Sequence, residues 1–528
     1  MSFETISPAQ MQQKLASNAE VAFLDVREQG VYAQGHPLWA TSMPLSRLEL
    51  EAERKLPRKS VDICLIDQGD GDGLSVRAAQ TLAEMGFTSL SILDGGILGW
   101  HGAGFEIFSG VNVPSKAFGE FVEHHCETPH ITADELKQRL EADENIVVFD
   151  SRPFDEYHRM SIPGAIDMPG AELVHRVFET VTDDETTIVI NCAGRTRSII
   201  GAQSLINAGV KNPVMALKDG TMGWYLAGHN LANHANIIAP EPSRENLDRS
   251  VRAARTVGAK AGVELLEKDG LLALQRQAED ISLFVLDVRT IEDFAAGHLP
   301  GSHFSPGGQL VQATDEYVAV KNSHLVLVDD REVRAWMSAS WLKQIGWSNV
   351  FVLTDLSGFE LASGTDDSAA LGGDITPLEL DAVNASGEAA AVLDLANSLA
   401  YRKSHIPGSY WVIRSRIAED LNFLPLVGYI VITADDERLA HLAVKDVKAA
   451  RPLAIVHVLT GGNEGWRQAG LPTEEGDTRL LSKQDDLWYK PYDNREKIRQ
   501  RMQEYLDWEV ALVPQVERDG STRFSVLE

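Results

Sequence analysis

The stretch AFLDVRE at residues 22–28 decides the fold, because a short apolar run ending in Asp occurs four times in the chain. The other copies are VVFDSRP at 147–153, FVLDVRT at 284–290 and AVLDLAN at 391–397. A Gly-aromatic pair follows each Asp after 75, 74, 72 and 72 residues, namely Gly99-Trp100, Gly223-Trp224, Gly358-Phe359 and Gly465-Trp466. Spacing this regular indicates one structural unit repeated four times.

Further landmarks recur in one order inside each unit. After the first apolar run come a turn rich in Pro and Gly, a second apolar run, a helical stretch and a third apolar run. Strands that are apolar throughout and alternate with helices predict a parallel sheet covered on both faces. The sequence therefore predicts four small doubly wound α/β domains.

The repeats set the expected domain limits. We expect domains at residues 1–110, 125–235, 256–368 and 373–475, then a tail at 476–528. Residues 102–127 and 228–258 mix Gly, Pro and polar residues without strand signals, and we interpret them as linkers.

The tail contains one segment with helical spacing. REKIRQRMQEYLDWEVALV places Ile498, Met502, Tyr505 and Leu506 near one face. We expect this helix to pack on the last domain, and a partner-binding helix is the alternative.

Composition restricts the location and the partners. No apolar run approaches the ~18–20 residues of a membrane helix, and the start MSFETISPAQ lacks the features of a secretory signal, so we expect a cytoplasmic protein. The net charge of −29, from 77 acidic and 48 basic residues, disfavours nucleic acid and anionic membranes as partners. A site that binds an anion therefore requires basic residues concentrated locally in this acidic chain.

The three cysteines form no CxxC pair, so we expect no disulfide framework, no metal and no cofactor. Cys64 lies inside the apolar run VDICLID and is predicted to be a core residue. Cys126 has His124, His125 and His130 nearby, but without regular ligand spacing.

Cys192 differs from the other two because it stands where a second apolar run ends, in Ile188-Val-Ile-Asn-Cys192-Ala-Gly-Arg-Thr-Arg-Ser198. Ligands bind at the carboxyl ends of parallel strands. Gly194 lets the backbone curl, and Ser198 is a good N-cap type. A loop wrapped in this way directs backbone N–H groups and a helix N-terminus at one point, which favours a thiolate.

Arg195 and Arg197 supply positive charge in an otherwise acidic chain. Their forked donors suit a sulfonate or similar oxyanion, held while the thiolate attacks the neighbouring sulfur. The expected intermediate is a persulfide on Cys192, which a second nucleophile then discharges.

The other units have no thiol at the equivalent strand end, where Asp67-Gln68, Asp329-Asp330 and Ala434-Asp435 stand. We interpret these units as inactive structural copies. The stretch GDGDGLS of unit one lacks the closing Glu of a calcium loop and is interpreted as a flexible acidic loop. A histidine recurs in one turn, at His36, His298 and His405, including in units without a nucleophile, and we expect it to have a packing role.

The D-x-R, I-P-G-A, strand-Cys-loop and Gly-Trp sequence resembles the rhodanese family of sulfurtransferases, over roughly residues 1–475. The resemblance implies four tandem rhodanese-like doubly wound domains with central parallel sheets, plus a C-terminal helical tail. It implies that Cys192 is the persulfide-forming nucleophile and that Asp150 and Arg152 support the loop. The implied substrate-binding residues are Ala193, Gly194, Arg195, Thr196, Arg197 and Ser198. Unit two departs from the pattern at Met160-Ser161, where unit three has Gly-His.

Several alternatives remain. A cysteine phosphatase or arsenate reductase places an arginine after five intervening residues, whereas here Arg197 follows Cys192 after four and Ser198 occupies the next place. Mercaptopyruvate-specific relatives tend to have a small, nearly neutral loop, so Arg195 and Arg197 favour thiosulfate as the donor. The acceptor is a thiol, cyanide or a protein, and an oligomer is compatible with the sequence. A non-enzymatic sulfur-binding or redox scaffold is the competitor from another class.

Overall fold

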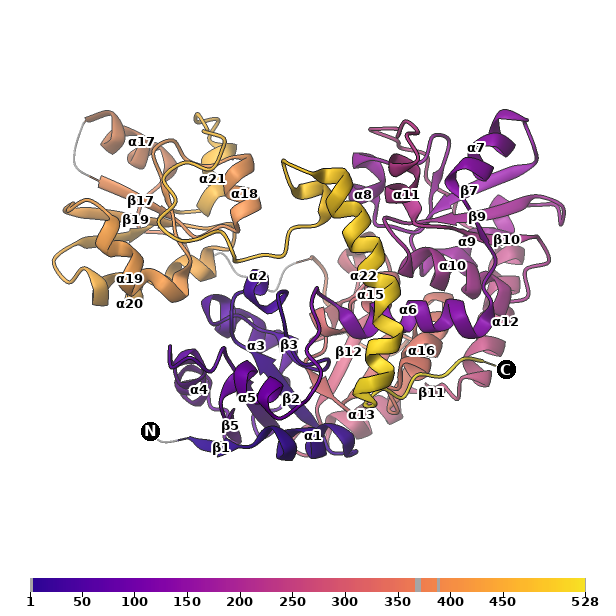
Figure 1. Ribbon diagram of the computed structural model, residues 1–528, viewed down its shortest axis with the longest axis horizontal. Coiled ribbons are helices and arrows are strands. Elements are labelled where there is room, and N and C mark those ends of the chain that lie inside the picture. The colour runs from indigo at the N-terminus through magenta and orange to yellow at the C-terminus, as the bar shows by residue number, and fades with distance from the viewer. Residues whose placement is uncertain (1–2, 366–371, 387–389, 528) are drawn as a thin grey trace.

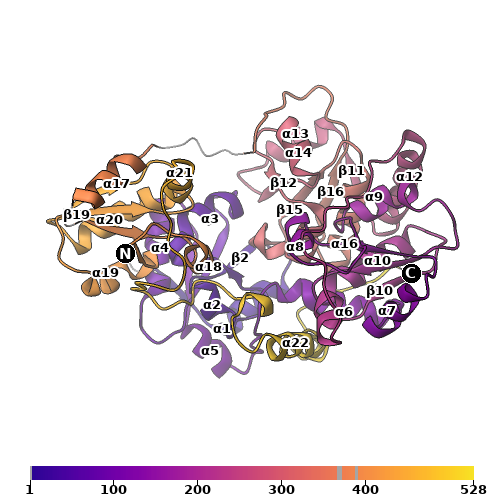
Figure 2. The ribbon, with the colours of Figure 1, turned by 90° about the horizontal axis from the view of Figure 1, so that it is seen from above.

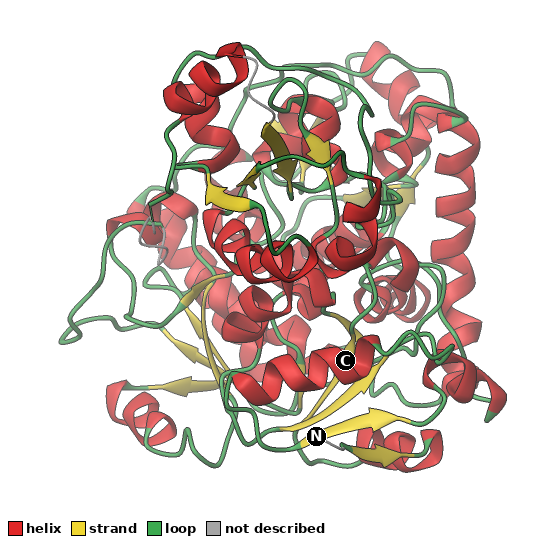
Figure 3. Ribbon diagram, turned by 90° about the vertical axis from the view of Figure 1, so that its left-hand side faces the viewer, coloured by secondary structure: helices red, strands yellow, loops and turns green. Residues whose placement is uncertain are grey.

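The computed structural model describes residues 3–365, 372–386 and 390–527, and these residues form four sheets, one for each repeat. The expected limits at residues 1, 368 and 528 lie outside the described residues. In every unit the strand that ends in the repeated Asp pairs in parallel with the strand that follows from the second apolar run. Helices lie on both faces of these sheets (Figures 1 and 3). The predicted class of tandem doubly wound α/β units is confirmed.

Units one and two begin alike, with a short strand and a capped helix. Capping boxes start α1, through Ser7 and Gln10, and α7, through Thr132 and Glu135. The elements of unit one are β1 (Glu4–Ile6), α1 (Pro8–Ala16), β2 (Val21–Asp25), α2 (Gln29–Tyr32), β3 (Thr41–Ser42), η1 (Leu45–Arg47), α3 (Leu48–Lys55), β4 (Asp62–Ile66), α4 (Leu74–Glu84), β5 (Leu90–Leu93) and α5 (Gly96–Gly102). Those of unit two are β6 (His130–Ile131), α7 (Ala133–Glu141), β7 (Ile146–Asp150), α8 (Phe154–Arg159), β8 (Ile166–Asp167), α9 (Glu172–Thr180), β9 (Thr187–Asn191), α10 (Thr196–Asn207), β10 (Val214–Leu217) and α11 (Gly220–Leu226).

Units three and four repeat the plan with small additions. The elements of unit three are β11 (Glu264–Leu266), α13 (Lys268–Gln275), β12 (Leu283–Asp287), α14 (Ile291–Ala296), β13 (His303–Phe304), α15 (Gly307–Gln312), η2 (Thr314–Glu316), β14 (Val320–Lys321), β15 (His324–Val328), α16 (Val333–Ile345) and β16 (Val350–Leu353). Those of unit four are α17 (Pro377–Ser386), β17 (Ala390–Asp394), α18 (Ser398–Lys403), β18 (Tyr410–Trp411), η3 (Arg414–Arg416), α19 (Ile417–Asp420), η4 (Leu421–Phe423), β19 (Tyr429–Thr433), α20 (Glu437–Ala450), β20 (Ile455–Val458) and α21 (Gly462–Gln468).

The segments predicted as linkers contain helices. α6 (Val113–Cys126) precedes unit two and α12 (Arg244–Lys260) precedes unit three. The tail contains η5 (Pro491–Asp493) and α22 (Ile498–Asp519). Among the described helices, none is long and apolar enough to cross a membrane.

Units one, two and three share one continuous core, whereas unit four has its own. Phe118 of α6 and Val257 of α12 belong to the shared core, so the connecting helices hold these units together. Unit four lies beside unit one and apart from unit two (Figures 1 and 2). Arg414 of unit four pairs with Glu49 of unit one at 2.7 Å, and the carboxylate of Glu28 accepts from Ser415 Oγ at 2.9 Å across the same junction.

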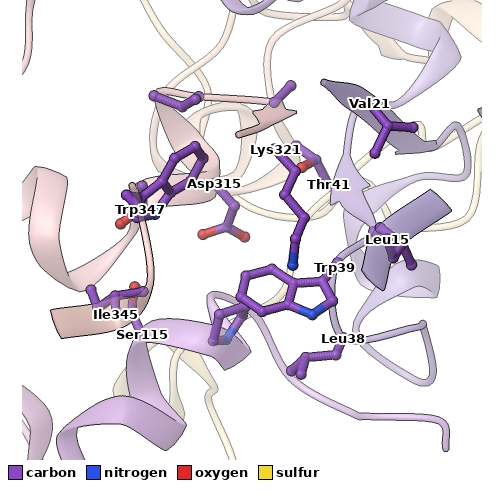
Figure 4. A pocket seen from close by; sticks show the side chains of 15 residues that line it. Leu15, Val21, Leu38, Trp39, Thr41, Ser115, Asp315, Lys321, Ile345 and Trp347 are labelled. Carbon is purple, nitrogen blue, oxygen red and sulfur yellow. The ribbon is translucent and has the colours of Figure 1, made fainter. Parts of the chain in front are cut away.

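Unit three also completes the sheet of unit one. β14 pairs antiparallel with β2, with Val320 opposite Ala22. A cavity of about 40 Å³ lies beside this junction. Figure 4 shows Lys321 extending across it to Trp39, with Nζ 3.6 Å from the ring centre. Burial lowers the pKa of Lys321 to about 7, and Arg523 acts in the same direction.

Candidate active site

Cys192 lies where the sequence predicted, directly after β9 and four residues before α10 begins. Its side chain is 2% exposed, and its Sγ lies 3.5 Å from Ser198 Oγ. Its carbonyl oxygen accepts from the backbone N–H and the hydroxyl of Thr221, both at 2.8 Å, which fixes the loop to α11. The three other units place Asp67, Asp329 and Ala434 directly after the equivalent strands β4, β15 and β19.

The helix begins earlier than Ser198 suggested. Arg195 is the N-cap of α10, and Ser198 lies inside the first turn, where its hydroxyl donates to the carbonyl of Arg195 at 2.7 Å. The first N–H groups of a helix lack partners within it, and the helix dipole places positive potential there. Cys192 therefore stands at a helix N-terminus, which is a position where anions bind.

Asp150 and Arg152 form a fully buried pair behind the loop. Arg152 donates from Nε to Asp150 Oδ1 at 2.8 Å and from Nη2 to Oδ2 at 2.7 Å. Asp150 Oδ2 also accepts from Asn191 Nδ2 at 2.8 Å. Because Asn191 precedes Cys192, this pair holds the end of the strand that carries the thiol.

Arg195 points away from the thiol, towards α6. Its guanidinium donates to Glu120 through Nε and Nη2, each at 2.7 Å, to Asp219 through Nη1 at 3.0 Å, and to Glu123. Burial raises the pKa of Glu120 to about 7, even though Arg195 favours the ionised form. The arrangement makes Arg195 a clamp between the loop and α6.

Arg197 faces the other side of the loop. Its Nη2 donates to Glu156 Oε2 of α8 at 2.8 Å, and its Nη1 to Gln309 Oε1 of α15 at 3.2 Å. Although burial opposes ionisation, Arg197 and Lys490 hold the pKa of Glu156 well below its usual range. Unit three therefore contributes directly to the surroundings of the loop.

The tail helix α22 covers this site, which corrects the expectation that it packs on the last domain. Figure 1 shows α22 running from unit two past α6 towards unit one. The predicted apolar face is present, but Met502 and Leu506 pack against Ala193 of the loop and Met222 of α11. No local sequence pattern predicts this location, because it depends on how the units are arranged.

Two buried charged residues near the loop were missed by sequence reasoning. Glu509 of α22 is 1% exposed, and its Oε1 accepts from Thr196 Oγ1 at 3.2 Å and from the hydroxyl of Tyr505 at 3.0 Å. Lys116 of α6 donates to Gln312 Oε1 of unit three at 2.9 Å. Lys116, Gly119, Glu120 and Glu123 are spaced as one helix face, and this pattern was the available signal.

Gly194 makes the close contact between loop and tail possible. A Cβ added there would lie 2.9 Å from Glu509 Oε2 and 3.2 Å from Tyr505 Cε1. The sequence predicted that glycine is needed at position 194 for backbone freedom. The structure shows a second requirement, because a side chain there would collide with α22.

A cleft of about 190 Å³ opens next to Arg197, between α8 and the tail. Arg152, Glu156 and Arg159 line it from unit two, and Lys490 and Tyr492 from the tail. Glu156 of this lining also binds Arg197, so an ion pair connects the wall of the cleft to the loop.

The remaining sequence expectations concern packing. His36, His298 and His405 are buried and stack on Tyr32, Phe294 and Tyr401 with ring centres 3.8 Å apart, so the predicted packing role is confirmed. Cys64 is a core residue of β4, and burial raises its pKa to about 12.

The acids that replace the thiol in units one and three have structural partners. Asp67 accepts from the backbone N–H groups of Gly69 and Ser75, at 3.0 and 2.9 Å. Asp329 accepts from the N–H of Arg334 at 2.8 Å, and the guanidinium of Arg334 also binds Glu172 of unit two. Among the described residues, no group of three or more His, Cys, Asp or Glu side chains is arranged to hold a metal ion.

Comparison with known proteins identifies the family of the chain and gives a match over its full length. A family model described as "Rhodanese-like domain" matches residues 7–103, 132–227 and 270–356. The crystal structure of thiosulfate sulfurtransferase from Pseudomonas aeruginosa is similar with 45% identity and a TM-score of 0.94, covering 100% of both chains.

Matches to curated proteins are shorter. YrkF of Bacillus subtilis, named as a candidate sulfur carrier protein, is 30% identical over 102 residues, which are 19% of this chain and 54% of that protein. The HTH-type transcriptional regulator Rv0324 of Mycobacterium tuberculosis is 39% identical over 98 residues, 19% of this chain and 42% of that protein. The chain thus spans about half the length of the curated relatives it matches.

Proposed function

Because this chain belongs to the rhodanese-like family, we propose that it is a sulfurtransferase that moves sulfane sulfur from thiosulfate to a thiophilic acceptor through a persulfide on Cys192. One observation carries the proposal. Of the four equivalent strand ends, that of unit two has a thiol, and this thiol lies at the N-terminus of a long helix. The name of the full-length match from Pseudomonas aeruginosa supports thiosulfate as the donor.

The first step is attack of the Cys192 thiolate on the outer sulfur of thiosulfate. The new S–S bond forms while the old one breaks, and sulfite leaves with the electron pair. The persulfide then carries a negative charge, which the N-terminus of α10 stabilises.

The second step discharges the persulfide. An acceptor nucleophile, such as cyanide or a thiolate, attacks the outer sulfur, and the electron pair of the broken S–S bond returns to Cys192 as a thiolate. We place this cycle in the cytoplasm, where thiols stay reduced.

The neighbouring residues have separate roles in this scheme. Asp150 and Arg152 hold the strand end, and Arg195 ties the loop to α6. Arg197 interacts electrostatically with Cys192 and contributes positive charge, while Ala193, Gly194, Thr196 and Ser198 shape the loop. We expect the donor to approach through the cleft between α8 and the tail, because its lining residue Glu156 binds Arg197 of the loop.

The test is formation of thiocyanate from thiosulfate and cyanide. Wild type should turn over and Cys192→Ser should not, and thiosulfate treatment should add ~32 Da to Cys192 and leave Cys64 unmodified. Equal inactivity of wild type and Cys192→Ser with both thiosulfate and 3-mercaptopyruvate would support a non-enzymatic sulfur-binding scaffold instead.

A second donor deserves the same assay. Arg195 is bound by three carboxylates, so the positive charge left for a dianion is smaller than the sequence suggested. 3-Mercaptopyruvate has a single carboxylate and is therefore the alternative donor. A higher kcat/KM with mercaptopyruvate than with thiosulfate would reverse our choice.

A further inference from the structure

The site needs a cation for the oxyanion of the donor, and the loop arginines are largely occupied. Arg195 is bound by three carboxylates, and Arg197 is bound by Glu156 and Gln309. Arg152 is paired with Asp150 through Nε and Nη2, and only its buried Nη1 is left without a hydrogen-bond partner among the described residues. The cation that binds the donor is therefore either another basic residue or an arginine that also keeps its carboxylate partner.

Lys116 is a basic residue for which the described residues provide no hydrogen-bonded carboxylate partner. Its side chain is 9% exposed, and among the residues that the structure describes its hydrogen-bond partner is the neutral amide of Gln312, at 2.9 Å. An ammonium group has three N–H donors, so donors remain for a ligand. Burial lowers the pKa of Lys116, as expected for an ammonium group held away from water, and Glu509 acts in the opposite direction.

Two independent contacts place Lys116 beside the loop. On α6 it shares a face with Gly119, whose added Cβ would lie 2.8 Å from Thr196 Cγ2, and with Glu120, which binds Arg195. On α15 its partner Gln312 lies one turn after Gln309, which binds Arg197. The ammonium of Lys116 and the guanidinium of Arg197 are therefore held by neighbouring side chains of one short helix. Both groups interact electrostatically with Cys192.

We propose that Lys116 is a donor-binding residue, whose ammonium group receives the sulfonate oxygens of thiosulfate while Cys192 attacks the outer sulfur. This inference rests on the proposed function. The S–S bond of thiosulfate breaks and sulfite leaves with its electron pair, while Lys116 binds the sulfonate oxygens equally before and during this step. The donor site is then assembled from unit two, the helix before it and unit three.

Steady-state kinetics give the first test. Lys116→Met should raise the KM for thiosulfate about tenfold with kcat changed about twofold or less, because a charge-assisted contact is lost. Lys116→Arg should retain most of the affinity. Lys211→Met removes the same charge from an exposed site of unit two and should behave as wild type. An unchanged KM in Lys116→Met would overturn the proposal.

A second test does not depend on turnover. Cys192 is alkylated with iodoacetate, which is anionic, and with iodoacetamide, which is neutral, and the modified Cys192 peptide is quantified by mass spectrometry. The iodoacetate-to-iodoacetamide rate ratio should fall about tenfold in Lys116→Met and remain high in Lys116→Arg and Lys211→Met. The ratio cancels changes in thiol reactivity and in opening of the site.

The two tests separate the possible failures. A lower ratio in a protein without thiosulfate activity would refute the transferase and leave Lys116 as an anion-binding residue. An unchanged ratio, with a loss of stability in Lys116→Met, would mean that Lys116 only offsets Glu509, and the proposal would be wrong.

Discussion

Replacing Arg195 by methionine should destabilise the contact between the loop and α6, and the loss should grow with pH. Removing one partner of a buried ion pair leaves an uncompensated charge, which costs about 3–5 kcal/mol. Glu123 and Asp219 are 23% and 28% exposed and can be hydrated, so most of the cost falls on Glu120, which is 5% exposed. We therefore expect about 3 kcal/mol at pH 8.

The pH dependence follows from Glu120. Its pKa of about 7 is raised above the ordinary value by burial and is restrained by Arg195, so the variant should have a still higher pKa. A raised carboxyl pKa means that stability is present at low pH and is lost as pH rises through the folded value. Below pH 6 both proteins hold Glu120 protonated, so the difference that remains there comes from the lost hydrogen bonds and does not depend on pH. Between pH 7 and 8 it should grow by about 1.4 kcal/mol.

Hydrogen exchange measures this locally, through the opening free energies of α6 and α10 after correction for the intrinsic rate at each pH. The control is Glu120→Gln in the Arg195→Met background, which removes the buried charge and should abolish the pH-dependent part. A loss that is the same at pH 6 and pH 8, or a double variant no more stable than Arg195→Met at pH 8, would refute this account of the clamp.

Three further predictions concern the tail and the unit junctions. Gly194→Ala should loosen α22, because the new Cβ would lie 2.9 Å from Glu509 Oε2; faster hydrogen exchange in α22 checks this, and unchanged exchange would contradict it. Burial raises the pKa of Glu28 to about 7, so the wild-type protein loses stability as pH rises from 5 to 7. In urea unfolding, the unfolding free energy of Glu28→Gln should rise by about 3 kcal/mol relative to wild type between pH 5 and 8. A difference between the two proteins that does not depend on pH would exclude this explanation. Lys321 has a pKa lowered to about 7, so the wild-type protein gains stability as pH rises from about 7 towards the ordinary pKa of lysine. In scanning calorimetry, Lys321→Met should therefore have a higher melting temperature than wild type at pH 7.5, and the difference should be smaller at pH 9.5.

Much of the fold was predictable because it is local and repeated. The run ending in Asp150 and its three copies predicted four sheets, and the position of Cys192 at a strand end made it the candidate nucleophile. Both predictions use residues close together in the sequence, whose apolar pattern directly reflects burial.

The surroundings of the thiol were not predictable in the same way. Arg195 was expected to face the donor, but Glu120 of a segment interpreted as a linker draws it to α6. Glu509 and Lys116 reach the loop because α22 and α6 are packed against unit two by contacts between units. Such contacts leave no periodic pattern, and a helix face shows that it is buried without showing which partner covers it.

The pairing of β14 with β2 has a consequence for the newly made chain. Unit one is synthesised first and its strand β2 pairs with β4, yet the outer edge of Val21 and Ala22 obtains a partner only when Val320 and Lys321 have been translated. At roughly 5–20 residues per second, the intervening ~300 residues take about 15–60 s. During that interval Val21 and Ala22 leave the edge opposite β4 open on a nascent chain, and an open edge of this kind recruits other strands. The ribosome therefore sets a period in which unit one needs protection, and the arrival of unit three ends it.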